Sequence, residues 1–129
     1  MSMPGEHAGL IVFAHGSSVE SANEAVRSVA RDMARSGELD HVVAAFLEGG
    51  RPELKAAVRE LAARPGIVRV VVVPYFLTLG LHLQRDLPRL VEEARRANPG
   101  LDIEVTAPLD GHPAMAEALV DRARACKPS

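Results

Sequence analysis

The chain has 129 residues, of which 47% are apolar and 25% are charged, as in an ordinary globular domain. Its net charge of −2 gives no electrostatic reason to expect nucleic acid or an anionic membrane as a partner. The single cysteine, Cys126, excludes an internal disulfide framework, the first residues show no leader pattern, and the longest apolar run is too short to span a bilayer. We therefore expect a cytoplasmic protein.

Four short apolar runs have the composition of buried strands. Residues 9–14 are rich in branched apolar side chains and end at a His-Gly-Ser turn. Residues 67–74 give the strongest signal, with five valines and one isoleucine in eight residues. Residues 41–46 and 101–106 are predicted as the second and fourth strands.

Apolar residues recur at helical spacing after each strand, so four helices with one apolar stripe each are expected, and the stripe of the third is expected to be buried. Gly37 suits the C-cap of the first helix, and Pro52 suits the first turn of the second. Asp86 is a good N-cap and Pro88 belongs in a first turn, so the third helix is predicted to begin near Leu87. The stripes are Ala22, Ala25, Val26, Val29, Ala30 and Met33; Leu54, Ala57, Val58, Leu61 and Ala62; Leu87, Leu90, Val91 and Ala94; and, after Pro113, Met115, Ala116, Leu119, Val120 and Ala123.

The regular alternation of strands and helices predicts an α/β fold with one domain over residues 1–129. The expected architecture is an open parallel four-stranded sheet with helices on both faces. In such sheets, ligands bind outside the carboxyl ends of the strands, at the point where the strand order reverses. This rule selects the loops over residues 15–18, 47–51 and 75–86.

Two histidines and one carboxylate, His15, His82 and Glu48, occur in these loops. Imidazole and carboxylate groups suit borderline divalent metals such as cobalt, iron, nickel and zinc. Each residue also has a purely structural interpretation: His15 could close a turn, His82 could lie on the surface at a helix start, and Glu48 could be an ordinary loop carboxylate. His112 is expected to help the turn before the last helix.

Several other functions lack their characteristic motifs. No Gly-x-x-x-x-Gly-Lys loop is present for nucleotide hydrolysis, and no Gly-x-Gly-x-x-Gly follows the first strand for a dinucleotide. Ser17 is not in a Gly-x-Ser-x-Gly elbow. A phosphohistidine-type phosphatase also places a His-Gly pair after its first strand, but it needs an arginine where Ala14 precedes His15 here. That class stays as an alternative.

Three segments resemble the small sirohydrochlorin cobalt/iron chelatases, the short class II tetrapyrrole chelatases. They are Ala-His-Gly-Ser at residues 14–17, Ala-Phe-Leu-Glu at residues 45–48, and the segment over residues 73–88. The last is the most specific, because its Pro-x-Phe-Leu-x-x-Gly-x-His-x-x-x-Asp-x-Pro spacing is improbable by chance. A weaker match joins Pro108-Leu109 to His112-Pro113.

The resemblance implies insertion of a divalent metal into sirohydrochlorin or a related tetrapyrrole without ATP or another nucleotide. The metal would be Co²⁺, toward cobalamin, or Fe²⁺, toward sirohaem, with Ni²⁺ as a further candidate. The resemblance implies that His15 and His82 hold the metal, that His15 also accepts a pyrrole proton, and that Glu48 assists. Glu48 or Arg51 would contact the substrate, and the ring site would be lined by Leu77, Thr78, Leu79, Gly80, Leu81 and His82.

Longer members of this family carry two such halves, so the resemblance also implies a homodimer with ring sites near its interface. Arg51, Arg85 and Arg89 are candidate partners for the carboxylates of the ring. One departure lies at residues 18–20, which are Ser-Val-Glu where family members often have Arg-Asp-Pro. A non-catalytic tetrapyrrole or metal carrier on the same scaffold is the principal alternative.

Overall fold

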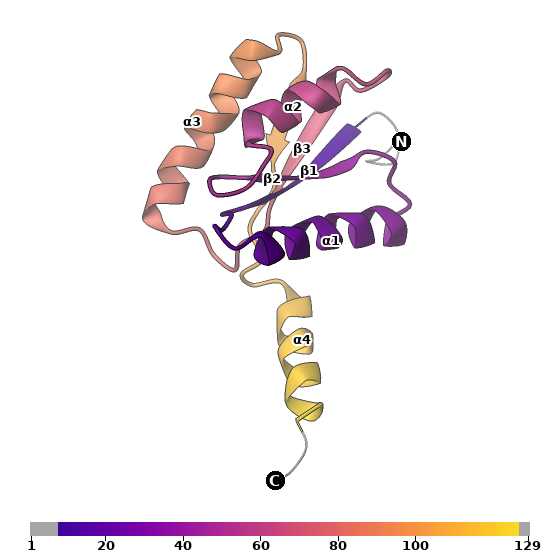
Figure 1. Cartoon of the computed structure of the whole chain (residues 1–129), viewed down its shortest axis with the longest axis vertical. Coiled ribbons are helices and arrows are strands. Elements are labelled where there is room, and N and C mark those ends of the chain that lie inside the picture. Colours follow the sequence, from indigo (N-terminus) through magenta and orange to yellow (C-terminus); the bar gives the residue numbers. More distant parts are fainter. Residues whose placement is uncertain (1–7, 127–129) are drawn as a thin grey trace.

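A computed structural model describes residues 8–126, in which strands and helices alternate throughout (Figure 1). The strands are β1 (Ala8–Ala14), β2 (Val42–Phe46), β3 (Arg69–Pro74) and β4 (Asp102–Val105), and the helices are α1 (Glu20–Ser36), α2 (Leu54–Ala62), α3 (Leu81–Ala97) and α4 (Pro113–Arg124). The prediction about a leader concerns the first residues, most of which lie outside the described part. The strands form one parallel sheet in the order β2-β1-β3-β4, which confirms the predicted α/β fold.

Strand β1 lies inside the sheet because it has no polar side chain. All seven of its residues are buried, and Leu10 lies between Val42 of β2 and Val71 of β3. The chain first moves from β1 to β2 and then crosses back to β3, so the strand order reverses between β1 and β3. The loops after β1 and β3 therefore flank the crevice where ligands bind in such folds.

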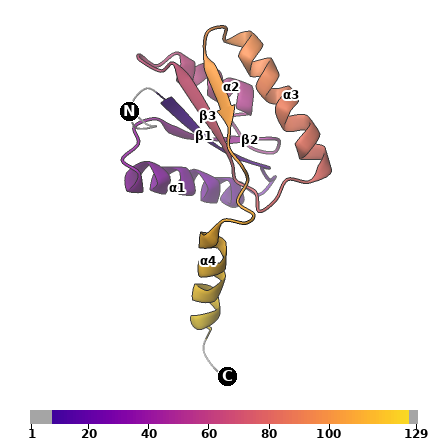
Figure 2. The same ribbon diagram turned by 180° about the vertical axis from the view of Figure 1, so that it is seen from behind.

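Helices cover both faces of the sheet, as predicted (Figures 1 and 2). Helix α1 covers β1 and β2 on one face, where Val12, Ala30 and Phe46 belong to one buried cluster. Helices α2 and α3 cover the other face, where Phe13 and Leu61 belong to a larger cluster.

Helix α3 begins earlier than predicted. It starts at Leu81 rather than near Leu87, and the predicted N-cap, Asp86, lies inside the helix together with Pro88. The reason is Leu83, which is buried one turn before Leu87 on the same face. Its burial offsets the hydrogen bond that Pro88 cannot donate. The histidine of the third loop therefore lies in the first turn of α3 instead of in a loop.

Smaller differences affect other element ends. Gly37 is the C-cap of α1 as predicted, but Pro52 precedes α2 instead of lying in its first turn. Strands β2, β3 and β4 begin one or two residues later than predicted. Ala22 and Ala25 of the predicted apolar stripe of α1 are exposed, and Asn23 is buried. The first turn of α1 faces the loops at the edge of the sheet, so its buried position holds a polar residue.

Helix α4 projects away from the rest of the molecule (Figures 1 and 2). His112 is its N-cap and accepts a hydrogen bond from the Ala114 amide, which confirms the expected role of His112 in that turn. No residue of α4 is buried, and α4 packs against no other described element, so its predicted apolar face is uncovered within one chain. None of the helices within residues 8–126 combines the length and apolarity that a bilayer crossing requires.

Candidate functional site

The carboxyl ends of β1, β2 and β3 bring the three predicted site loops to one edge of the sheet. The backbone continues the sheet into these loops: Leu47 N donates to Ala14 O over 2.9 Å, and Tyr75 N donates to Phe13 O over 2.7 Å. The loops after β2 and β3 are therefore each hydrogen-bonded to the end of β1, as the parallel arrangement predicts.

The loops after β1 and β2 lie in backbone contact, and two glycines make this possible. Gly16 has a φ of +92°, and a Cβ there would lie 1.6 Å from the Glu48 carbonyl oxygen. Gly49 has a φ of +73°, and a Cβ there would lie 2.9 Å from the Ser17 carbonyl carbon. Only glycine fits both the conformation and the space, so these positions fix the separation of the two loops.

This contact brings together two of the predicted site residues. His15 Nε2 lies 3.5 Å from Glu48 Oε1, and the two side chains are 60% and 70% exposed. His15 Nδ1 lies 3.1 Å from the Gly16 carbonyl oxygen. Because a carbonyl can only accept, Nδ1 carries the proton in this contact, and Nε2 of the neutral ring is left to accept a proton or bind a metal.

Asn23 of α1 holds the two loops in place, a role that the sequence analysis missed. Its side chain is 1% exposed. Oδ1 accepts from Ser17 N (2.9 Å), and Nδ2 donates to Ser17 O (2.8 Å) and to Gly49 O (3.0 Å). A signal was present in the sequence, because Asn23 has helical spacing with Val26 and Ala30 and so shares their face.

His82 is exposed in the first turn of α3, two residues after the N-cap Gly80 and directly before the buried Leu83. It lies at the same sheet edge as His15 and Glu48, because α3 follows the loop after β3. Within the described chain, no hydrogen bond or ion pair joins His82 to His15 or Glu48. That both imidazoles act on one metal stays a prediction.

An exposed apolar surface precedes His82. The residues predicted to line a ring site are Leu77, Thr78, Leu79, Gly80, Leu81 and His82, and all except Leu79 are exposed. Leu77 is 65% and Leu81 80% exposed. Phe76 anchors the segment through a tilted ring contact with Phe13 at 6.2 Å between centroids. Large apolar side chains that are exposed at the same sheet edge as the His15–Glu48 pair are typical of a surface that binds a partly apolar ligand.

The profile of the CbiX family matches residues 9–126. The chain belongs to the CbiX family. It is 30% identical over 122 residues to the chloroplastic sirohydrochlorin ferrochelatase of Arabidopsis thaliana, covering 95% of this chain and 54% of that protein. It is 31% identical over 132 residues to the sirohydrochlorin cobaltochelatase of Methanothermobacter thermautotrophicus, covering 90% of each.

A solved CbiX structure has the same fold. The crystal structure of a CbiX protein from Marinobacter aquaeolei superposes with a TM-score of 0.78 at 29% identity, covering 91% of this chain and 94% of that chain. This CbiX chain therefore spans about half of the plant protein but nearly all of the bacterial one. The family resemblance that the loop motifs predicted is confirmed.

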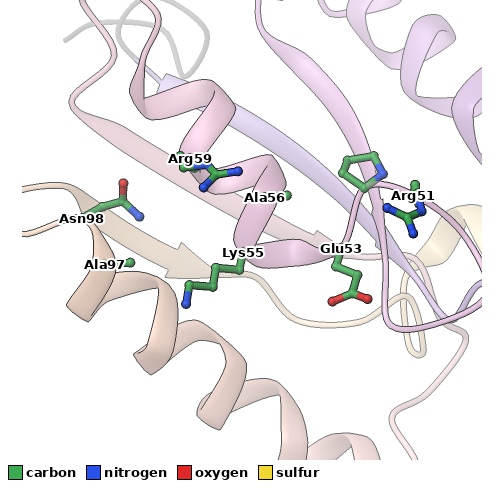
Figure 3. Close-up of a pocket in the computed structure, with 8 residues that line it drawn as sticks. Arg51, Glu53, Lys55, Ala56, Arg59, Ala97 and Asn98 are labelled. Atoms are coloured by element: carbon green, nitrogen blue, oxygen red, sulfur yellow. The ribbon is translucent and has the colours of Figure 1, made fainter.

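Arg51 of this CbiX chain begins a cationic groove on the outer surface (Figure 3). The groove has a volume of about 800 Å³ and is lined by Arg51, Lys55 and Arg59 together with Glu53, and also by the end of α3. Figure 3 shows Lys55 pointing from α2 toward α3. Among residues 8–126, none of the three cations forms an ion pair, so their charges are available to an anionic ligand. His15, Glu48 and His82 do not line this groove, which extends from Arg51 to the C-terminal end of α3.

The departure at residues 18–20 places a carboxylate beside another arginine. Glu20 Oε1 lies 2.6 Å from Arg27 Nη1, and this hydrogen-bonded ion pair holds the pKa of Glu20 below its usual value. Arg27 also donates to the Arg51 carbonyl oxygen over 3.1 Å and lies 5.3 Å from the centroid of the Phe46 ring. The arginine close to this loop is therefore Arg27 of α1, and it is already paired with Glu20.

Arg85 and Arg89, the other predicted partners of the ring carboxylates, differ in whether they are already paired with a carboxylate of this chain. Arg89 contacts Glu93 (3.1 Å) and Asp86 (3.8 Å) of its own helix, whereas Arg85 forms no ion pair in the described chain. Across residues 8–126, no group of three or more His, Cys, Asp or Glu side chains gathers at metal-binding distance.

Proposed function

We propose that this CbiX chain inserts a divalent metal, Co²⁺ or Fe²⁺, into sirohydrochlorin or a closely related tetrapyrrole without a nucleotide. The observation that carries the proposal is the solvent-open pair of His15 and Glu48 at the sheet edge that also exposes Leu77 and Leu81. A flat macrocycle needs an apolar surface to lie on and a base near its centre, and this edge offers both. The names of the ferrochelatase and cobaltochelatase relatives support the substrate.

The reaction exchanges two pyrrole protons for one metal ion, which must shed its bound ligands. His15 Nε2 takes a pyrrole proton, and the Glu48 carboxylate, 3.5 Å away, stabilises the imidazolium that forms. The proton then leaves to water, since both side chains are exposed, and the second pyrrole proton leaves by the same route. Once Nε2 is unprotonated again, it can bind the metal. His15 and His82 hold the incoming metal as exchangeable ligands, because a closed four-ligand site would retain it.

The carboxylates of the ring require cationic partners. Arg51 is the residue we assign first, because it follows the Glu48 loop and has no ion-pair partner among the described residues. Residues 77–81 support the ring, and Arg85 of α3 is the second candidate for a carboxylate contact. We further propose that the active form is a homodimer, in which two chains together have about the length of the longer plant relative.

The test is metal insertion measured directly. The protein is mixed anaerobically with sirohydrochlorin and Co²⁺ or Fe²⁺, and the absorbance of the ring is followed against a protein-free control. Insertion faster than the control, without ATP, supports the proposal. Tight binding without acceleration would indicate a carrier, and hydrolysis of a generic phosphoester without any effect on the ring would indicate a phosphatase.

A further inference from the structure

The cationic groove along α2 holds positive charges that no carboxylate of the described chain neutralises. Arg51, Lys55 and Arg59 line it, and none of them forms an ion pair within residues 8–126. The other described arginines are paired with a carboxylate, apart from Arg85 on α3 and two arginines on α4. Positive charge that is free to act on a ligand is therefore concentrated in this groove.

The stability of α2 does not explain where these cations lie. Lys55 is in the first turn of α2 and Arg51 precedes the helix, so both lie at the end where the helix dipole is positive. Cations are unfavourable at this end of a helix. The first turn has no acidic residue, and Glu53 at the N-cap is the one carboxylate among the residues that line the groove. The dipole and the cations therefore add to one positive potential, which favours an anionic ligand.

The charge of the whole chain would not attract such a ligand. The net charge is −2 at pH 7, and the tetrapyrrole of the proposed function carries carboxylates around its ring, so the two molecules repel each other overall. At about 0.1 M salt the Debye length is about 10 Å, so an approaching anion responds mainly to the charges close to it. A surface on which cations outnumber carboxylates can therefore attract the ring in spite of the net charge.

The groove begins next to the candidate site, because Arg51 belongs to the same loop as Glu48. Lys55 and Arg59 are four positions apart on α2, so they lie one turn, or about 6 Å, apart on one side of the helix (Figure 3). We propose that Lys55 and Arg59 attract the polycarboxylate ring from solution and steer it to Arg51 and the site edge. The inference rests on the proposed function and adds the residues that set the rate of substrate capture.

Steering and direct contact change different rate constants. A steering charge raises the association rate constant and leaves the dissociation rate constant nearly unchanged, because it acts before the complex forms. Steering also depends on charge rather than on hydrogen-bond geometry, so lysine and arginine are equivalent for it, as they are not at a bidentate contact. Lys55 and Arg59 therefore act on association, whereas the loss of the Arg51 contact speeds dissociation.

The test is the binding of metal-free sirohydrochlorin, followed anaerobically by its fluorescence in a stopped-flow instrument. In the double variant Lys55→Gln/Arg59→Gln, the association rate constant should fall about tenfold at about 0.01 M salt, with little change in the dissociation rate constant. At about 1 M salt the Debye length is about 3 Å, and the variant should associate as fast as the parent chain. Equal association rates at low salt, or a change confined to dissociation, would overturn the proposal.

Two control variants separate the groove from the net charge. Lys55→Arg/Arg59→Lys keeps both charges and should keep the association rate of the parent chain. Arg31→Gln/Arg35→Gln removes two charges from α1, which covers the opposite face of the sheet, and should change association less than twofold. A loss in this second control as large as that in Lys55→Gln/Arg59→Gln would show that net charge governs association, and would overturn the proposal.

The binding test is independent of metal insertion, because no metal is present. Association that depends on Lys55 and Arg59, in a chain that does not insert metal, would contradict the proposed function and leave this inference standing. Insertion by a chain whose association does not depend on Lys55 and Arg59 would contradict this inference alone.

Discussion

The two halves of the candidate site are built in different ways. The β1–β2 half, which holds His15 and Glu48, is fixed by backbone contact and by the buried amide of Asn23. The β3 half, residues 75–82, instead presents exposed apolar side chains and an exposed histidine. Contacts within one chain hold the β1–β2 half in place. The β3 half has an exposed apolar surface, which a ligand or a second copy would bury. Substitutions that loosen the first half should therefore cost stability, whereas those in the second should mainly change turnover.

The largest effect is expected from His15→Ala. Removing the base and ligand should lower kcat for metal insertion by about 1,000-fold, within the range for a general base. The free energy of unfolding should hardly change, because the side chain is 60% exposed. His41→Ala is the matched control: His41 contacts Arg64, away from the site, and its loss should leave kcat unchanged. Equal losses of kcat in the His15→Ala and His41→Ala variants would show that His15 has no specific role in metal insertion.

Gly16→Ala should be the most destabilising change in the β1–β2 half. Residue 16 has a positive φ, at which a side chain is strained, and the added methyl group would lie 1.6 Å from the Glu48 carbonyl oxygen. We expect a loss of about 3 kcal/mol in the free energy of unfolding. Gly80→Ala tests the β3 half, where φ is −71° and no atom lies within 4 Å, so its cost should stay below about 1 kcal/mol. Urea unfolding measures both. Similar costs at the two positions would contradict the difference between the halves.

Asn23→Ala should cost about 2 kcal/mol of stability, because it leaves Ser17 and Gly49 backbone groups without their partners. As a positioning residue, Asn23 should also lower kcat more than it raises KM, since it sets the distance between the two loops. Asn98→Ala removes one side-chain hydrogen bond to Ala94 O outside these loops and should leave kcat intact. A stability loss in Asn23→Ala with normal kcat would reduce Asn23 to a structural role.

The smallest predicted effect is that of Arg51→Ala. Loss of one carboxylate contact should raise KM for the tetrapyrrole by about tenfold and change kcat little. Arg59→Ala, at the other end of the same groove, should raise KM less. Steady-state kinetics with varied tetrapyrrole measures both, and an unchanged KM in Arg51→Ala would exclude Arg51 from the substrate site.

The sheet and its site edge could be predicted because they depend on local composition. Runs such as residues 67–74 have few alternatives to a buried strand, and the parallel order then places His15, Glu48 and His82 at one edge. The start of α3 differs from the prediction because a local rule and tertiary packing disagreed. Pro88 favoured a late start, but the burial of Leu83, which no local rule weighs, favoured an early one.

Asn23 and α4 show what sequence patterns leave open. A stripe of apolar residues predicts burial, and a polar residue on the same face was not considered, although Asn23 is the buried side chain that joins two loops. The stripe of α4 was recognised, but periodicity does not say which molecule covers it. Hydrogen bonds between loops depend on the folded structure, so only coordinates could assign them.

The central claim is that His15, in the loop after β1, and His82, in the first turn of α3, act on the same metal ion. A cycle of His15→Ala, His82→Ala and the double variant, with Co²⁺ insertion into sirohydrochlorin as the readout, tests it most directly. If both act on one metal, each single change removes most of the activity, and the double variant is only slightly slower than either. Losses that multiply in the double variant, or a His82→Ala variant of normal rate, would contradict the account.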